Sequence, residues 1–274
     1  VSLYGLSPDL EEFRQISRKY GIPIINDAAE AYGAECCQQS INKWAQITSY
    51  SLENSKHITT GDGGIVVTDD EYLAIKMRKF GSLSYAAMKA GDGRIRLNKA
   101  VFQNPNYSRH DDVGLNYRMP EVAAALGLAQ LERIDFFIDK RISNSNAYKQ
   151  ITKNCEWLEE QLIPSGYIHT QWTYVTKIMR DDISWQVFKE RFEKFGGDGP
   201  FGCWKITYQE DLFVNRAYER LNPNIYKDQT YPIGTCPLAE SIQPKLLQFP
   251  TNQGTKEDIE KQCKALKLTI ESFN

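Results

Sequence analysis

Long apolar runs, a strong charge imbalance and cysteine pairs at metal-ligand spacing are all missing from this 274-residue sequence. No stretch of about 18 apolar residues occurs, so we expect no segment to cross a bilayer. The formal net charge is −2, with basic and acidic residues interspersed, which argues against a broad nucleic-acid-binding surface. The six cysteines are too sparse for a disulfide scaffold and lack metal-ligand pair spacing, which favours a reducing, cytoplasmic compartment and no metal.

The amino end lacks both an initiator methionine and a basic segment followed by an apolar one, so no signal peptide is predicted. The apolar string VSLYG opens the chain as though it were cut inside a strand. We therefore expect the chain to be part of a longer protein.

Strand-like and helix-like segments alternate in the first half, which indicates an α/β layer architecture. Ser7-Pro8-Asp9 is typical of a helix start, with Ser7 as the cap, and Gly21 of a helix end. The string IPIIN then predicts a short, fully buried strand of the kind found in parallel sheets. Further along, we expect strands at 47–52 and 64–68, a helix at 69–81, a long surface excursion at 89–114 and a long helix from Pro120.

The second half alternates less regularly. A strand is expected at 169–179, followed by helices at about 184–195 and 255–272. We interpret this part as a smaller α+β domain.

Two charged residues occupy positions where open α/β sheets hold ligands. Asp27 follows the IPII strand, and Lys56 lies in the short connection between two strands. Each also has an ordinary explanation, because an acid after a strand is usually a turn residue and a loop lysine is usually solvated.

Three strings together are more specific than either residue. NDAAEAYGA, SYSLENSKHITTGDGG and GLNYRMPEVAAALGLAQLE occur in this order, at spacings that resemble the DegT/DnrJ/EryC1/StrS sugar aminotransferases. The resemblance implies pyridoxal 5′-phosphate (PLP) as cofactor and the aspartate aminotransferase fold (type I), with a mostly parallel sheet in the large domain. It also implies that residues 1–135 are part of the PLP-binding large domain, and that residues 136–274 form a linking helix and a small domain.

The resemblance also implies roles for individual residues. Lys56 matches the lysine that carries PLP as a Schiff base and later moves a proton. Asp27 matches the acid that keeps the pyridine nitrogen protonated, so that the ring accepts electrons. Ser51 matches a hydroxyl that binds the cofactor phosphate, and Asn116 an asparagine that reaches the phosphate in the neighbouring subunit. Glu30 stands where the family usually has Gln or His near the ring, which is a departure.

Each of the weaker candidate site residues has two possible interpretations. Arg118 either binds a diphosphate or holds a subunit interface, and His110 either lies near the substrate or is structural. The turn at 59–64 either contacts the cofactor or is only a Gly-rich turn. The GxGxxG match at 197–202 is rejected as a dinucleotide site, because a helical stretch precedes it and Pro200 interrupts it.

The resemblance implies transfer of an amino group, with glutamate as the expected donor, onto a nucleotide-linked keto-sugar such as a 4-keto-6-deoxyhexose. The expected assembly is a homodimer with shared active sites. A dehydratase of the same fold remains an alternative, although such enzymes carry histidine where Lys56 stands; a non-catalytic PLP-binding regulator is another. In the family an earlier segment supplies a phosphate-binding turn and a ring that stacks on PLP, so we expect the chain alone to bind PLP weakly or not at all.

Overall fold

The computed structural model describes residues 1–91, 97–220 and 230–273, and the chain forms two compact units. The first unit comprises residues 1–139 and 163–170, and the second comprises residues 140–162 and 171–274. The boundary predicted at residue 135 remains a prediction about domains of the whole protein. Within the described ranges, no helix is long and apolar enough to cross a membrane.

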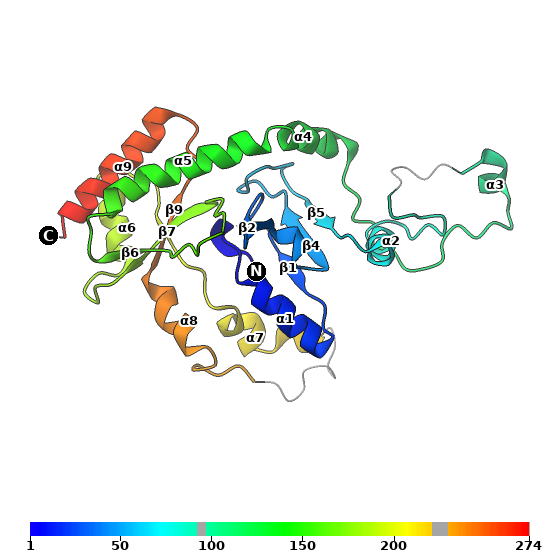
Figure 1. Cartoon of the computed structure of the whole chain (residues 1–274), viewed down its shortest axis with the longest axis horizontal. Coiled ribbons are helices and arrows are strands. Elements are labelled where there is room, and N and C mark those ends of the chain that lie inside the picture. Colours follow the sequence, from blue (N-terminus) through cyan, green and yellow to red (C-terminus); the bar gives the residue numbers. More distant parts are fainter. Residues whose placement is uncertain (92–96, 221–229, 274) are drawn as a thin grey trace. The chain divides into compact units, whose positions relative to one another are not determined.

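The first unit is built on a three-stranded mixed sheet (Figure 1). Its strands, in the spatial order β1-β4-β5, are β1 (Ile25–Asp27), β4 (Ile47–Ser51) and β5 (Gly64–Val67). β1 and β4 are parallel, whereas β4 and β5 are antiparallel. The expectation of a mostly parallel large sheet is therefore wrong for the described residues. The connection through Lys56 folds back on itself, with the Leu52 N–H donating to the Gly63 carbonyl at 3.0 Å, and this brings β5 beside β4 in the antiparallel direction.

β1 also differs from the fully buried strand that IPIIN predicts. Ile22 and Ile25 are exposed, while Asn26 is buried. The reason is that β1 is an edge strand of this sheet, with only β4 as its paired neighbour within the described residues.

Helix α1 (Leu10–Tyr20) precedes β1 and begins two residues later than expected. The Asp9 side chain, rather than Ser7, caps it by accepting a hydrogen bond from the Glu12 N–H at 3.0 Å. Gly21 ends the helix in the left-handed conformation, with φ 65°, as the sequence predicts.

Small residues form the core beneath α1. Leu10 packs against a cluster of buried residues that follow β1. Its buried members are Leu10, Ala28, Ala31, Ala34, Cys36, Ile41 and Trp44. The hairpin of β2 (Glu35–Cys36) and β3 (Gln39–Ser40) contributes to this core, and the 163–170 segment bridges to it through Ile168 and Glu35.

Helix α2 (Glu71–Phe80), capped by Asp70, follows β5, and the short α3 (Lys99–Gln103) lies in the expected surface excursion. The long helix expected from Pro120 is in fact two helices, α4 (Glu121–Leu131) and α5 (Ile134–Thr152). The chain turns between them at Glu132–Arg133, where neither proline nor glycine marks the break.

The second unit contains a four-stranded antiparallel sheet in the order β6-β7-β9-β8. Its strands are β6 (Leu158–Glu160), β7 (Thr173–Ile178), β8 (Phe201–Gly202) and β9 (Leu246–Pro250). Helices α6 (Trp185–Lys194) and α9 (Lys256–Glu271) begin at the caps Ser184 and Thr255, and α7 (Asp211–Val214) and α8 (Pro237–Ile242) are short.

Aromatic residues dominate the core of the second unit. Phe188 and Phe192 of α6 pack around Phe249 of β9, and Tyr148 of α5 joins them. Gly197 and Gly202 of the rejected GxGxxG match pack directly on Phe192 and Trp185, where a Cβ would collide with the ring. Gly202 also ends a strand rather than opening a helix, so these glycines serve packing.

Candidate active site

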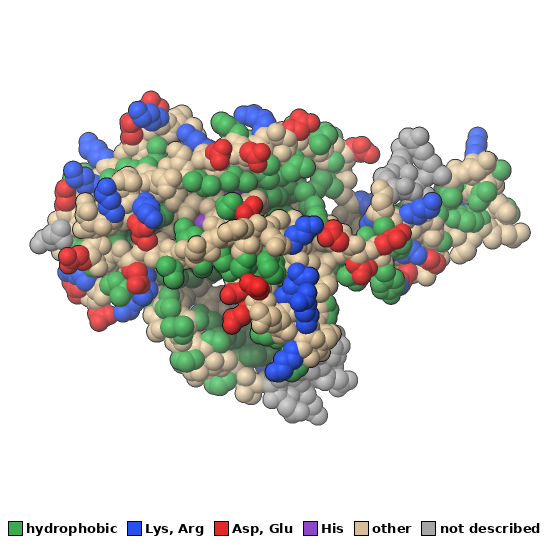
Figure 2. All heavy atoms as spheres, in the orientation of Figure 1, with side chains coloured by type: hydrophobic (Ala, Val, Ile, Leu, Met, Phe, Trp, Pro, Cys, Tyr) green, Lys and Arg blue, Asp and Glu red, His purple; other side chains and the backbone are tan. Residues whose placement is uncertain are grey.

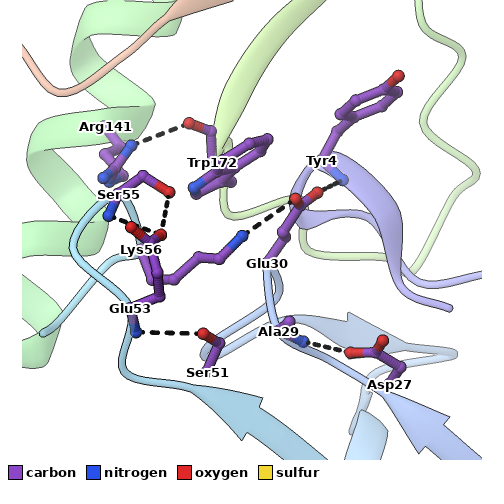
Figure 3. A network of polar contacts seen from close by, with 10 residues as sticks. All are labelled: Tyr4, Asp27, Ala29, Glu30, Ser51, Glu53, Ser55, Lys56, Arg141 and Trp172. Atoms are coloured by element: carbon purple, nitrogen blue, oxygen red, sulfur yellow. Dashed lines mark hydrogen bonds and ion pairs between the residues drawn. The ribbon is translucent and has the colours of Figure 1, made fainter. Parts of the chain in front are cut away.

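The carboxyl ends of two parallel strands meet at one edge of the first unit's sheet. β1 ends at Asp27 and β4 ends at Ser51, and Asp27 pairs in register with Ser49. The loop that follows β4 carries Lys56, and Figure 3 shows the Lys56 side chain extending toward Glu30, which follows β1. Four of the seven site residues expected from the sequence are thus grouped at the edge where such folds bind ligands.

Asp27 is exposed and makes a local turn contact. Its Oδ1 accepts a hydrogen bond from the Ala29 N–H at 3.0 Å, while its backbone carbonyl accepts one from the Ser2 N–H at 2.7 Å. This is the ordinary behaviour of an acid after a strand. Since an ionised carboxylate offers about four acceptor positions, the turn contact is compatible with a further partner.

The loop that carries Lys56 is closed at its base. The Leu52 carbonyl accepts hydrogen bonds from the Thr60 N–H and the Thr59 hydroxyl, both at 3.0 Å. Next to Lys56, His57 and Ile58 are buried, and the His57 Nε2 lies 3.0 Å from the Thr170 carbonyl. The loop is therefore fixed on both sides of the lysine.

A second contact holds this loop from α4. The Thr59 N–H donates to Gln130 Oε1 at 2.9 Å, across 71 positions of sequence. Gly127, one turn earlier in α4, lies so close to Thr60 that a Cβ would approach its methyl group to 2.9 Å. Gln130 was not predicted as a site residue. The one feature that could have indicated it is that, apart from Glu121, it is the only polar or charged side chain in α4.

Lys56 and Glu30 form an ion pair that is largely shielded from solvent. The Nζ lies 3.2 Å from Glu30 Oε1, and the two side chains are 13% and 7% exposed. The other carboxylate oxygen, Oε2, accepts the Tyr4 N–H at 2.9 Å. Both oxygens of this buried carboxylate therefore have partners, as burial of a charge requires.

Ser51 lies at the start of the loop. Its hydroxyl accepts a hydrogen bond from the Glu53 N–H at 3.1 Å, and its carbonyl accepts one from the Tyr32 hydroxyl at 2.9 Å. Burial, together with the neighbouring Tyr50, raises the pKa of Tyr32 well above its usual range, so Tyr32 stays a proton donor.

The remaining three residues lie in the segment after α2 and are exposed. Arg118 Nε donates to Asn116 Oδ1 at 2.7 Å, and Asn116 adopts a left-handed conformation with φ 55°. His110 Nδ1 lies 2.6 Å from the Leu83 carbonyl, and its ring centroid is 5.1 Å from that of Tyr85. These contacts order the segment locally.

The fold of the chain and the site in its first unit together indicate the class of protein. An aminotransferase structure from Psychrobacter cryohalolentis superimposes with a TM-score of 0.79 at 24% identity, covering 98% of this chain and 67% of that one. The chain thus has the fold of an aminotransferase. It belongs to the DegT/DnrJ/EryC1/StrS aminotransferase family, whose model matches residues 1–267.

Curated relatives resemble a shorter part of the chain. A GDP-perosamine synthase from Escherichia coli is 30% identical over 172 residues, which cover 63% of this chain and 42% of that protein. A UDP-4-amino-4,6-dideoxy-N-acetyl-beta-L-altrosamine transaminase from Campylobacter jejuni is 33% identical over 155 residues, covering 56% and 37%. The matched part spans less than half the length of these two relatives.

Proposed function

We propose that this protein is a PLP-dependent aminotransferase that moves an amino group from glutamate onto a nucleotide-linked keto-sugar. The observation that carries the proposal is the grouping of Lys56 with a buried carboxylate at the sheet edge where Asp27 and Ser51 also lie. Family membership and the two sugar-nucleotide relatives support it.

The donor set suits PLP group by group. Lys56 offers an amine to an aldehyde, Asp27 a carboxylate to a pyridine nitrogen, and Ser51 a hydroxyl to a phosphate. All three come from β1, β4 or the loop after β4. When bound, PLP supplies the aldehyde that a lysine holds covalently and a ring that accepts electrons from the reacting carbon.

Each residue then has a task that its surroundings allow. Lys56, on a fixed loop, would hold the cofactor through Nζ and, once released, move a proton at the substrate carbon as a general base. Asp27 would hold a proton on the ring nitrogen through its negative charge. Ser51 is one hydroxyl at the phosphate, and Asn116 would reach the phosphate of a neighbouring subunit.

A nucleotide-linked sugar as substrate rests on the relatives' names. Arg118 is exposed and carries a guanidinium, which suits two phosphate oxygens at once, and His110 lies on the same segment. We propose both for the substrate side of the site, and a 4-keto-6-deoxyhexose as the sugar.

Two alternatives are separated by the fate of the substrate. A dehydratase of this fold would remove a sugar hydroxyl, and a non-catalytic PLP-binding regulator would leave the substrate unchanged. Lys56 favours transfer, because a lysine rather than a histidine occupies the position that holds the cofactor.

The first test uses absorbance and peptide mapping. Full-length protein with excess PLP is expected to gain a visible band that borohydride fixes covalently, with the adduct on Lys56. Lys56→Ala should abolish that adduct, whereas Lys43→Ala, which removes an exposed lysine, should not. An adduct on another lysine would refute the assignment.

The second test follows the product. The protein is incubated with glutamate and a panel of keto-sugar nucleotides, and products are identified by mass spectrometry. An aminated sugar supports transfer, a dehydrated sugar supports the dehydratase, and an unchanged panel supports the regulator.

A further inference from the structure

Glu30 is fixed independently of the lysine it pairs with. It follows β1 through Ala28 and Ala29, and its Oε2 is held at 2.9 Å by the backbone N–H of Tyr4, itself a buried residue. Only Oε1 faces Lys56 Nζ, at 3.2 Å. A backbone amide does not move with the lysine side chain, so the carboxylate stays in place when Nζ changes its bonding.

A carboxylate and a carboxamide would act differently at this position. Either could accept the Tyr4 N–H, because both have a carbonyl-type oxygen. Only the carboxylate places a negative charge 3.2 Å from Nζ, in a setting where the two side chains are 13% and 7% exposed. An anion this close and this shielded can serve as the counter-ion of a cation at that position.

We propose that Glu30 is a positioning residue for Lys56: a fixed counter-ion that holds Nζ at the sheet edge and stabilises the protonated imine formed there with the cofactor aldehyde. This inference rests on the proposed function. In that step the neutral amine and the aldehyde join as C=N, and the carbonyl oxygen leaves as water with both amine hydrogens. The imine nitrogen then takes up one proton from solvent, which faces Glu30.

Other charged or titratable groups surround the pair. Glu53 lies on the lysine's own loop, where the Ser55 N–H and hydroxyl occupy its Oε2, and these bonds, more than Lys56, lower its pKa. His57 follows Lys56, and its ring centroid lies 6.0 Å from that of Tyr32. Asp27 ends β1. The Glu30 carboxylate contacts Nζ directly, at 3.2 Å.

The test titrates the imine rather than the reaction. One portion of the full-length protein with excess PLP is reduced with borohydride to confirm the adduct on Lys56, and the visible absorbance of an unreduced portion is recorded against pH. For Glu30→Gln, the pH at which the imine loses its proton should fall by about 1 to 2 units relative to wild type. Glu53→Gln is the matched control and should shift the midpoint far less.

Glu30→Asp supplies a second measurement if the glutamine variant does not fold. It keeps the negative charge but shortens the side chain by one methylene, which moves the charge away from Nζ. The pH midpoint of its imine titration should therefore lie between that of the wild type and about one unit lower. Wild-type midpoints in both Glu30 variants, or an equal shift in Glu53→Gln, would overturn the role of Glu30 and leave the proposed function standing. An adduct that is absent from Lys56 in the wild type would overturn both.

Discussion

At the residue scale, Asp27 allows its hydrogen bond within the turn to be tested separately from its proposed chemical role. Asp27→Asn keeps an oxygen for the Ala29 N–H, so folding should be preserved. The amide carries no charge to hold a proton on a ring nitrogen, and we expect transfer to fall by roughly 10² to 10⁴.

Steady-state transfer from glutamate checks this, with circular dichroism as the folding test. Asp69→Asn removes another exposed carboxylate, near the end of β5, and should leave the rate unchanged. Near-native turnover in Asp27→Asn would refute its proposed role.

His169 gives a pH-dependent prediction that needs no cofactor. Burial lowers its pKa to about 4, against an ordinary value of 6.5, with a partial offset from the Gly5 backbone. The unfolded chain therefore takes up a proton as pH falls below about 6.5, while the folded chain does so only near 4. Relative to its value above pH 6.5, the free energy of unfolding therefore falls on acidification, by about 2 kcal/mol at pH 5.

Urea unfolding of wild type and His169→Gln at pH 7.5 and pH 5 measures this. The variant has no imidazole to protonate, so its free energy of unfolding should decline less between the two pH values. An equal decline in both proteins would show that His169 is not the group responsible.

Residue types and strand ends predicted part of the site. Asp27 could be placed because it follows a predicted strand, and Lys56 because it lies in the connection between two predicted strands, whereas Ser51 came only from the family resemblance. The contact between Glu30 and Lys56 could not, since it spans 26 positions and depends on how two loops fold back. The Tyr4 N–H that fixes Glu30 belongs to the backbone, so no residue type in the sequence indicates it.

At the element scale, the link between α4 and the lysine loop is open to test. Gln130→Ala removes the acceptor of the Thr59 N–H, and loss of one such bond costs about 1 kcal/mol. We expect amide exchange in residues 52–63 to become several-fold faster.

Hydrogen exchange followed by mass spectrometry reads this loop directly. Gln130→Glu retains an acceptor oxygen and should restore slow exchange, while Gln150→Ala, on the exposed side of α5, is the control. Unchanged exchange in Gln130→Ala would mean that α4 does not hold the loop.

The helices α6 and α9 and the strands β4 and β5 lie close to their predicted ranges, whereas β9 was not predicted. The Ser184 and Thr255 caps marked α6 and α9 close to their observed starts. β9 was missed, although it lies between β7 and β8 in its sheet, because its apolar string gives no two-residue alternation. Pairing with distant strands, not local preference, makes it a strand.

At the scale of the whole molecule, α4 carries the strongest sign of association. No residue of this apolar helix is buried, and Val122 and Leu128 are 83% and 60% exposed. Figure 2 shows hydrophobic side chains at the surface in this region. Soluble proteins rarely leave a contiguous apolar helix face in water, so the expected homodimer has a plausible contact surface here.

Leu128→Glu tests whether α4 joins two copies. The side chain is already exposed in the monomer, so the free energy of unfolding of a dissociated chain should change little. A buried glutamate at a subunit interface would cost several kcal/mol, raising the dimer dissociation constant by roughly 100-fold or more. Sedimentation velocity over a range of protein concentrations measures that constant.

Leu162→Glu is the matched control, because Leu162 is 84% exposed and lies outside the helices and strands of the second unit. It makes the same chemical change away from α4 and should leave association as in the wild type. Equal dissociation constants for Leu128→Glu and the wild type would exclude α4 from the contact. In that case Asn116, which lies four residues before Pro120, the cap of this helix, would also lose its proposed route to the phosphate of a neighbouring subunit.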